Sequence, residues 1–103
     1  MGAAESNPYV LRLYVTDATP TSARAIVNAR RILEDHLAGR YSLEILDIAE
    51  HVDAAASDQI IATPTLLRLF PLPQRRLIGD LSDATRVLKS LGVSTPLIQG
   101  ESK

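Results

Sequence analysis

The pattern of apolar and polar positions begins with a strand and continues with a long helix. The run YVLRLYV (Tyr9–Val15) is apolar except for Arg12, which predicts a buried, central β-strand. Thr19 and Pro20 then favour a helix start, because threonine caps free N–H groups and proline needs no donor in the first turn. Gly39 favours the end of this helix. Its inner stripe is predicted to consist of Ala23, Ile26, Ala29, Leu33 and Leu37.

A second strand and a short helix are predicted next. The segment YSLEILDI (Tyr41–Ile48) alternates in part between apolar and polar residues, which favours a strand. The segment from Glu50 to Ile60 favours a short helix, because four apolar residues fall near helical spacing. These four residues are Val52, Ala55, Ala56 and Ile60.

The last third of the domain predicts a hairpin and a closing helix. The β-like runs TLLRLF (Thr65–Phe70) and RRLIGDL (Arg75–Leu81) are separated by PLPQ, which indicates a hairpin connection. Ser82 is predicted to cap a final helix, and Gly92 to end it. The inner stripe of that helix is predicted to be Ala84, Val87, Leu88 and Leu91.

The predicted order of elements is therefore β-α-β-α-β-β-α. A right-handed crossover makes the first two strands parallel, and the hairpin adds two antiparallel strands. We expect an α/β, thioredoxin-like fold with a four-stranded mixed sheet in the strand order 2-1-3-4 and helices on both faces. The second strand would lie on an edge. This domain is expected to span residues 9–92, with a flexible leader over 1–8 and a flexible tail over 93–103.

Composition and charge narrow the class of protein. The chain has 103 residues, 46% of them hydrophobic and 22% charged, which fits one folded domain. The formal net charge of −1 gives no field that would attract nucleic acid or an anionic membrane. No stretch approaches the ~20 apolar residues of a membrane span, and the polar start lacks a signal-peptide core. A cytoplasmic protein without nucleic-acid or membrane partners is expected.

The chain contains no cysteine, which excludes disulfides and thiol chemistry. In redox proteins of the thioredoxin-like fold, a Cys-x-x-Cys pair begins the first helix, opposite a cis-proline at the start of the third strand. Here the first position reads DATP (Asp17–Pro20), while Pro64 is kept between two threonines. We expect a cis bond before Pro64, since a proline entering a strand offers no N–H to the ladder. The architecture is retained, but a redox enzyme is not expected.

No other motif indicates catalysis or metal binding. His36 and His51 lie 15 residues apart on different predicted helices, without a third strong ligand nearby. Two ordinary histidines are therefore favoured over a metal site. A Ser-His-Asp set would lack a nucleophile in a recognisable strained turn. We expect neither an active site nor a cofactor.

The basic residues are nine arginines and two lysines, a bias that fits fixed contacts with carboxylates. Arg24 and Arg31 share one face of the first predicted helix, and three more arginines lie on the predicted hairpin: Arg68, Arg75 and Arg76. A solvated polar surface and a docking patch for an acidic partner are both open interpretations. The predicted edge strand is a second candidate surface, because its unpaired backbone groups invite a partner strand. Its acidic residues, Glu44 and Asp47, could instead prevent such pairing.

The segments TPTSAR and ATPTLLRLFPLPQRRLIGDLSD make the sequence resemble the circadian clock protein KaiB family. The resemblance extends from Tyr9 to about Leu91, and the longer segment is its most specific part. It implies a non-enzymatic regulator that binds the N-terminal ATPase ring of a KaiC-type clock kinase and modulates its phosphorylation and output signalling. It also implies a KaiA-type activator and a clock-output histidine kinase as further partners. The alternatives are a role in a non-circadian timer or stress response, or a sensory domain acting on a histidine kinase.

The resemblance also implies a second fold. KaiB-family proteins are metamorphic: a ground state of βαββααβ order, commonly tetrameric, exchanges slowly with a monomeric thioredoxin-like state that binds KaiC. Such a switch requires two packings of similar free energy. Residues up to about Ile48 keep their structure in both states. The tetrameric ground state is therefore the alternative fold for this chain.

Carried over residue by residue, the resemblance implies two partner surfaces. The KaiC-facing positions are Tyr9, Arg24, Arg68 and Arg75. The edge strand that pairs with a KaiA-type partner holds Leu43, Glu44, Ile45, Leu46 and Asp47. Members of the family typically carry lysines where this chain has Glu44 and Gln59, a difference that weakens the positive patch.

A second difference concerns the fold switch. Family members usually carry a glycine and an aspartate where this chain has Ser90 and Gly92. Serine inside a helix and glycine just after it both favour the terminal helix. We therefore expect the thioredoxin-like state, as a monomer, to be more populated than in clock members. Slow isomerisation of X-Pro bonds is a further hypothesis for slow exchange between the folds. The prolines concerned are Pro64, Pro71 and Pro73.

Overall fold

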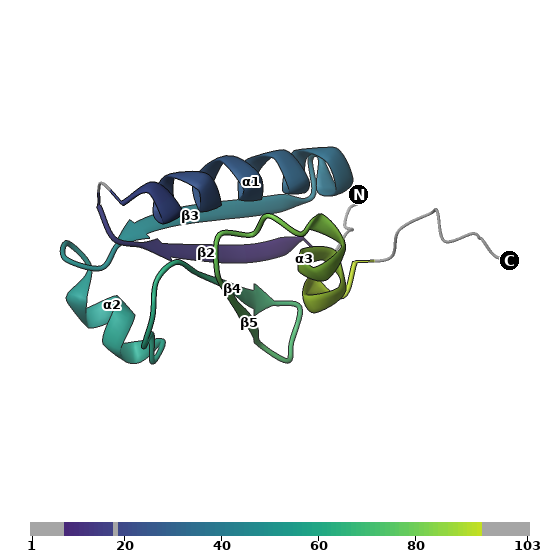
Figure 1. Ribbon diagram of the computed structural model, residues 1–103. Helices are drawn as coiled ribbons and strands as arrows, with labels where there is room; N and C mark the ends of the chain where they lie inside the picture. Colours follow the sequence, from purple (N-terminus) through teal and green to yellow (C-terminus); the bar gives the residue numbers. More distant parts are fainter. Residues whose placement is uncertain (1–7, 18, 94–103) are drawn as a thin grey trace, which may run out of the picture.

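The computed structural model describes residues 8–17 and 19–93. Apart from Pro8 and Val93, the expected leader and tail lie outside these residues. The described residues form four strands, β2 (Tyr9–Val15), β3 (Tyr41–Asp47), β4 (Thr65–Phe70) and β5 (Arg75–Ile78). They also form three helices, α1 (Pro20–Leu37), α2 (Val52–Ser57) and α3 (Ala84–Leu91), arranged as in Figure 1. The order of elements is the predicted one.

The four strands form one mixed sheet in the order β3-β2-β4-β5. β2 and β3 are parallel and in register from the pair Tyr9–Tyr41 to the pair Val15–Asp47, with α1 as the crossover. β4 is antiparallel to β2, and β5 is antiparallel to β4. The thioredoxin-like prediction is confirmed, with β3 on one edge of the sheet and β5 on the other.

Helix α1 begins and ends where predicted but is rotated relative to the predicted stripe. The Thr19 side chain accepts a hydrogen bond from the Ser22 N–H at 3.2 Å, which makes it the N-cap. Ala23, predicted to face inward, is exposed. Ser22 is buried instead, because its hydroxyl accepts a hydrogen bond from the Thr16 N–H at 3.0 Å and so fixes the first turn over the end of β2. The buried residues of α1 are Ser22, Ala25, Ala29, Ile32, Leu33 and Leu37.

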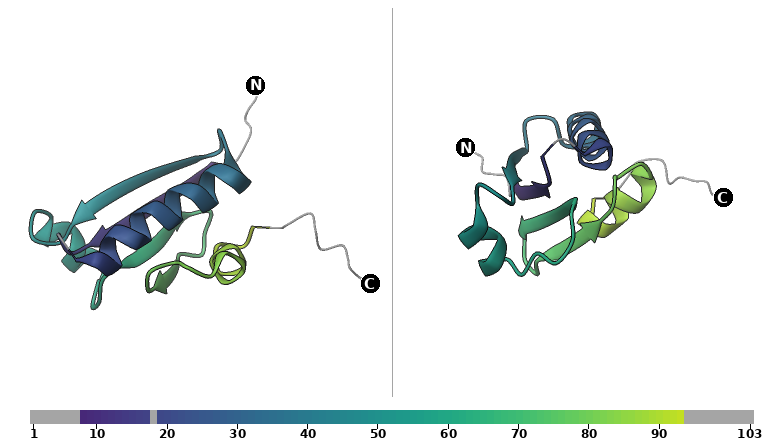
Figure 2. Two further views of the ribbon diagram at one scale, coloured as in Figure 1. Left: turned by 45° about the horizontal axis from the view of Figure 1, so that its top comes forward. Right: turned by 60° about the vertical axis from the view of Figure 1, so that its left-hand side comes forward.

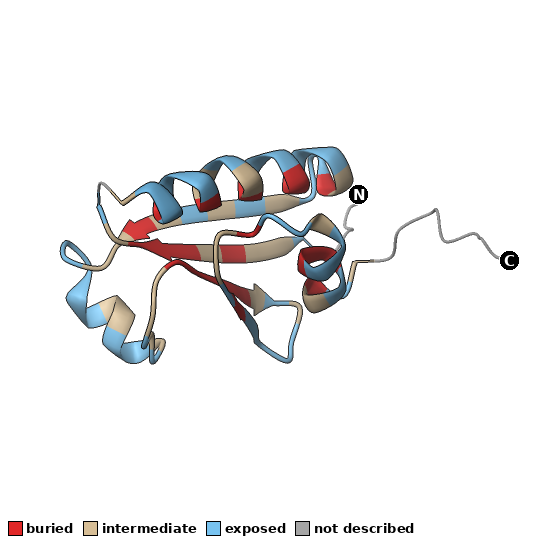
Figure 3. Ribbon diagram, in the orientation of Figure 1, coloured by how far each residue is buried: buried red, intermediate tan, exposed pale blue. Residues whose placement is uncertain are grey.

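Helices α1 and α3 lie on one side of the sheet and α2 on the other (Figure 2). The main hydrophobic core lies under α1 and α3 and includes Leu13 of β2, Leu33 of α1 and Leu88 of α3. Because side chains alternate along a strand, Arg12 and Tyr14 project toward the opposite face. Figure 3 shows the buried stretches of β2 and β4 at the centre of the molecule.

Helix α2 does not bury the stripe predicted for it. None of its residues is buried, and Val52 is 63% exposed. Six residues make fewer than two turns, which is too short for an apolar face of its own. The segment is held instead by polar contacts of the loop that follows it. No helix in the described part of the chain has the length and apolarity needed to cross a membrane.

The hairpin leads into α3 through a turn that differs from the prediction. Asp83, not Ser82, is the N-cap of α3, because its carboxylate accepts a hydrogen bond from the Arg86 N–H at 3.1 Å. The Ser82 N–H bonds to Asp80 Oδ1 at 3.0 Å, which keeps Ser82 in the preceding turn. The predicted inner residues Val87, Leu88 and Leu91 are buried, and Gly92 ends the helix with φ 76°. The peptide bonds before Pro64, Pro71 and Pro73 are cis.

Candidate functional site

Strand β3 has no strand partner on its outer side among the residues that the structure describes. Leu43 and Ile45 pack against the core beneath α1, whereas Leu46 is buried without being part of that cluster. Packing of alternate residues holds the strand in place, so its outer N–H and C=O groups form a fixed row. A fixed row of unpaired backbone groups is what an added partner strand requires.

The acidic side chains of β3 have partners within the chain. Glu44 Oε1 accepts a hydrogen bond from Arg12 Nε at 3.0 Å, and Asp47 Oδ1 accepts the Ala49 N–H at 2.8 Å. The charge of Glu44 is therefore partly balanced by a cation of the same molecule. This weakens the interpretation that these carboxylates keep other strands away from the edge.

The positions that the sequence assigned to a KaiC-facing surface do not form one patch. Arg75 is exposed and pairs in register with Arg68, which places it toward the start of β2, the end that carries Tyr9. Arg24 lies at the opposite end of the sheet, where its Nε is 3.5 Å from Asp80 Oδ2 in the loop after β5. The structure brings Tyr9 and Arg75 to one end and leaves Arg24 at the other.

Arg68 is the position at which the docking expectation needs correction. The residue is 5% exposed. Its Nη1 donates to the Leu91 carbonyl at 2.5 Å, and its Nη2 donates to the Pro73 carbonyl at 2.6 Å. In this fold the guanidinium contacts other parts of the chain and does not face a partner. The leucines on both sides of Arg68 were the signal that it belongs to a strand buried on both faces.

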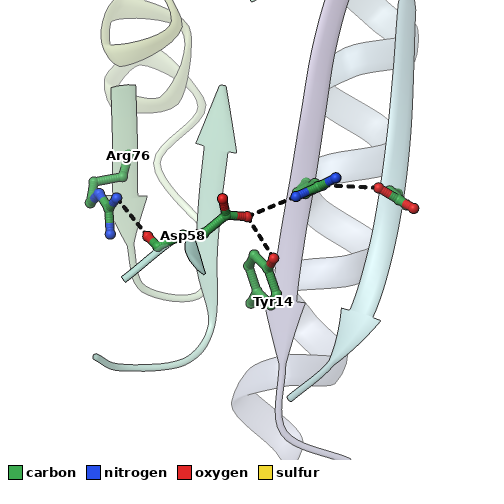
Figure 4. Close-up of polar contacts among 5 residues, drawn as sticks. Tyr14, Asp58 and Arg76 are labelled. Carbon is green, nitrogen blue, oxygen red and sulfur yellow. Dashed lines mark hydrogen bonds and ion pairs between the residues drawn. The ribbon is translucent and has the colours of Figure 1, made fainter. Parts of the chain in front are cut away.

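A polar cluster that sequence reasoning missed lies on the opposite face of the sheet (Figure 4). Asp58, in the loop after α2, accepts hydrogen bonds from the Tyr14 hydroxyl at 2.6 Å and from Arg12 Nη1 at 2.9 Å. Arg76 of β5 donates to the Asp58 carbonyl at 2.9 Å and to the Gln59 carbonyl at 3.0 Å. The loop after α2 is thus tied to β2 and to β5.

The contacts of this cluster set its charge states. Partial burial by itself would raise the pKa of the Asp58 carboxyl, but the hydrogen bonds from Tyr14 and Arg12 outweigh burial and hold that pKa below its ordinary value. Burial and then the hydrogen bond to Asp58 raise the pKa of the Tyr14 hydroxyl. At neutral pH an anion therefore accepts from a neutral phenol and a guanidinium. Such a cluster joins segments and carries no proton poised for transfer.

The end of the sheet that carries cysteines in redox proteins of this fold carries hydroxyls here. The hydroxyl oxygens of Thr16 and Thr63 are 2.6 Å apart, which joins the loop before α1 to the residue before Pro64. An open cleft of about 460 Å³ is lined in part by Thr16 and lies between the start of α1 and the end of β3. Within residues 8–17 and 19–93, no three side chains are grouped to hold a metal ion. This end of the sheet has no thiol for redox chemistry.

Two solved structures define the class of the fold. The N-terminal domain of SasA from Synechococcus elongatus superposes with a TM-score of 0.69 at 25% identity, over 100% of this chain and 95% of that one. Mitochondrial thioredoxin 3 from Saccharomyces cerevisiae superposes with a TM-score of 0.68 at 14% identity, over 84% of this chain and 79% of that one. The protein is a thioredoxin-like domain without cysteine.

The family is shown by the sequence comparisons. The KaiB domain model matches residues 12–93. The circadian clock oscillator protein KaiB of Synechococcus elongatus is 44% identical over 93 residues, which cover 90% of this chain and 87% of that protein. The chain belongs to the KaiB family, and the resemblance drawn from its ATPTLLRLFPLPQRRLIGDLSD segment is confirmed.

Proposed function

We propose that this protein is a non-enzymatic circadian clock regulator that binds a KaiC-type ATPase in the cytoplasm and modulates its phosphorylation and output signalling. The observation that carries the proposal is a KaiB-family chain held in a thioredoxin-like fold, with β3 and β5 as the outer strands of the sheet among the described residues. The KaiC-type partner is the one that family membership implies. The N-terminal domain of SasA shares the fold, which supports a setting among clock proteins.

The surface best suited to the KaiC-type ring is the hairpin surface, which we define as Phe70, Leu72 and Arg75. Leu72 is 71% exposed and Phe70 is 40% exposed, so two large apolar side chains of the hairpin are accessible to solvent. The guanidinium of Arg75 is exposed as well. The segment from Thr65 to Gly79 contains no acidic residue. Apolar contact area with positive charge at its rim suits an acidic partner surface. Arg68 is not part of this surface because it is buried.

The open edge of β3 is proposed as the second surface. Its residues 43–47 lie on the edge opposite β5, so a KaiA-type activator could add a strand there while the hairpin surface is occupied. This protein would compete with a clock-output histidine kinase for the KaiC-type ring if the kinase binds that ring through a domain of the same fold. The similarity to SasA also supports the alternative function, a sensory domain acting on a histidine kinase.

The decisive experiment combines the purified protein with a KaiC-type ATPase from the same organism. Co-migration with the ring in size-exclusion chromatography is expected. Arg75→Glu should weaken binding by about tenfold, because it reverses a charge at the rim of the contact. Arg31→Glu is the matched control, since Arg31 is exposed on α1 and its side chain donates to Asn28. No co-migration of the wild type would refute the proposal, and equal loss in both variants would refute the hairpin surface.

We also propose that this chain holds the thioredoxin-like state as a monomer and reaches a second fold only by slow exchange. Ser90 lies in the last turn of α3, and Gly92 has the left-handed conformation that ends the helix. Both residues favour the helical form of this segment. Sizing and a two-dimensional amide NMR spectrum test the proposal. A stable tetramer with a strand over residues 87–91 would contradict it.

A further inference from the structure

The guanidinium of Arg68 joins two segments that are distant in sequence. Leu91 is the last residue of α3, and Pro73 lies in the turn between β4 and β5. Arg68 donates to the carbonyls of both, at 2.5 Å and 2.6 Å. Among the described residues, no other hydrogen bond links the end of α3 to this turn. One side chain therefore connects the terminal helix to the hairpin.

The chemistry of this contact suits the end of a helix. The last carbonyls of a helix lack partners within it and carry partial negative charge, so a cation is favoured there. Arg68 supplies that cation, and it forms none of the ion pairs between described residues. Its Nε is buried without a hydrogen-bond partner, which offsets part of the stabilisation. The two hydrogen bonds of the guanidinium stabilise the contact, and the unpaired Nε weakens it. A contact of this limited strength suits a connection that can open and close.

Gly92 completes the arrangement. It has φ +76°, and a Cβ atom placed on it would lie 3.0 Å from Arg68 Nη1. Gly39, at the end of α1, has nearly the same backbone with φ +77°, but a Cβ atom there would meet nothing within 4 Å. Both positions favour glycine because of the left-handed backbone. Of these two positions, only at 92 would an added Cβ atom also press against a guanidinium, which would have to shift by a few tenths of an ångström.

We propose that Arg68 and Gly92 form a latch that holds the carboxyl end of α3 against the β4–β5 turn. Opening the latch would release the carboxyl end of α3 from the turn, while Val87, Leu88 and Leu91 still pack in the core shared with β2 and α1. The role of Arg68 is then intramolecular. This inference does not rest on the proposed function, since it concerns the isolated protein.

The two glycines provide a matched test in the isolated wild-type background. Gly39→Ala introduces the left-handed backbone penalty alone, whereas Gly92→Ala adds a methyl group against the guanidinium. Amide exchange is compared over residues 87–91 in Gly92→Ala and over α1 in Gly39→Ala. We expect the acceleration in Gly92→Ala to be about tenfold larger, which is the size that the loss of a charged hydrogen bond would give. Equal acceleration in the two variants would overturn the latch.

Removing the guanidinium provides the second test. Arg68→Met keeps an unbranched stem in the buried position but removes the guanidinium and both donors, so exchange over residues 87–91 should accelerate by about tenfold relative to exchange in α1. In that background, the excess effect of Gly92→Ala over Gly39→Ala should disappear. Arg76→Met is the control, because Arg76 donates to the carbonyls of residues 58 and 59 and should leave exchange in α3 unchanged. Uniform acceleration in α1 and α3, or a persistent excess at Gly92, would overturn the proposal.

Discussion

Replacing Tyr14 with phenylalanine tests whether the cluster of Arg12, Tyr14 and Asp58 stabilises this fold. Tyr14 is 0% exposed, and its hydroxyl donates to Asp58 Oδ2 at 2.6 Å. Phenylalanine retains the ring and its packing and removes only that donor. A hydrogen bond to a charged group contributes about 1.5–3 kcal/mol to stability. Asp58 keeps its contact with Arg12, so we expect a loss near the lower limit, about 1.5 kcal/mol.

The partner substitution and a double variant isolate the pairwise energy. Asp58→Asn keeps an oxygen acceptor for the Tyr14 hydroxyl but removes the charge that faces Arg12 at 2.9 Å. We expect it to lower the free energy of unfolding by about 1–2 kcal/mol. The double variant should lose less than the sum of the two single losses, by about 1 kcal/mol, because Asp58→Asn already weakens the charged hydrogen bond that Tyr14→Phe removes.

Urea unfolding followed by far-ultraviolet circular dichroism measures these losses, and thermal unfolding should show a Tm about 6–12 °C lower for Tyr14→Phe. Tyr41→Phe is the control, since the Tyr41 hydroxyl donates to Glu34 at 3.0 Å in an exposed position. Its effect should stay within about 0.5 kcal/mol. If Tyr14→Phe behaves like Tyr41→Phe, or if the two cluster substitutions are additive, the cluster does not hold the loop to β2.

Two further predictions concern the charge of Asp58 and the hydrogen bond of Asn28. The pKa of Asp58 is lowered in the folded chain, so its contribution is present above the unfolded value of about 3.9 and is lost as pH falls through the lower folded value. Below about pH 5, stability should therefore fall more steeply in the wild type than in Asp58→Asn; parallel curves in a pH series of urea unfolding would contradict this. Asn28→Ala removes the amide that donates to the Asp80 carbonyl at 2.9 Å and should lower the free energy of unfolding by about 1 kcal/mol. The neighbouring Arg31→Ala, measured in the same urea assay, should stay within about 0.5 kcal/mol, and an equal loss in both would contradict the role given to Asn28.

The order of elements could be predicted from sequence because each element has its own local signal. The apolar run of β2, the Thr19–Pro20 start of α1 and the Gly92 end of α3 all depend on residues adjacent in the chain. The misplaced details depend on tertiary contacts. Ala23 was predicted to face inward, but the hydrogen bond of Ser22 to Thr16 decides the rotation of the helix. Ser82 was predicted as a cap, but the preceding turn holds it.

The candidate site was harder to predict than the fold. The family resemblance placed Arg68 on a partner-facing surface. Its guanidinium is buried instead, because it donates to the carbonyls of Leu91 and Pro73, and the sequence does not show that these carbonyls lie beside it. Arg12 interrupts an apolar strand and therefore signalled a polar partner on its face. Nothing in the sequence near Asp58 identified it as that partner, because the two residues are 46 positions apart.

The two outer strands of the sheet, as the described residues form it, also bear on self-association. β3 carries Glu44 and Asp47, and β5 carries Arg75 and Arg76, so the edges are opposite in charge. Joining β3 of one copy to β5 of the next would be a heterologous, head-to-tail contact, which extends into filaments unless its rotation closes a ring. Three of the four side chains already bond to groups of their own chain, Glu44, Asp47 and Arg76. Internal pairing of these charges lowers the complementarity between copies and so disfavours head-to-tail polymerisation of the sheet.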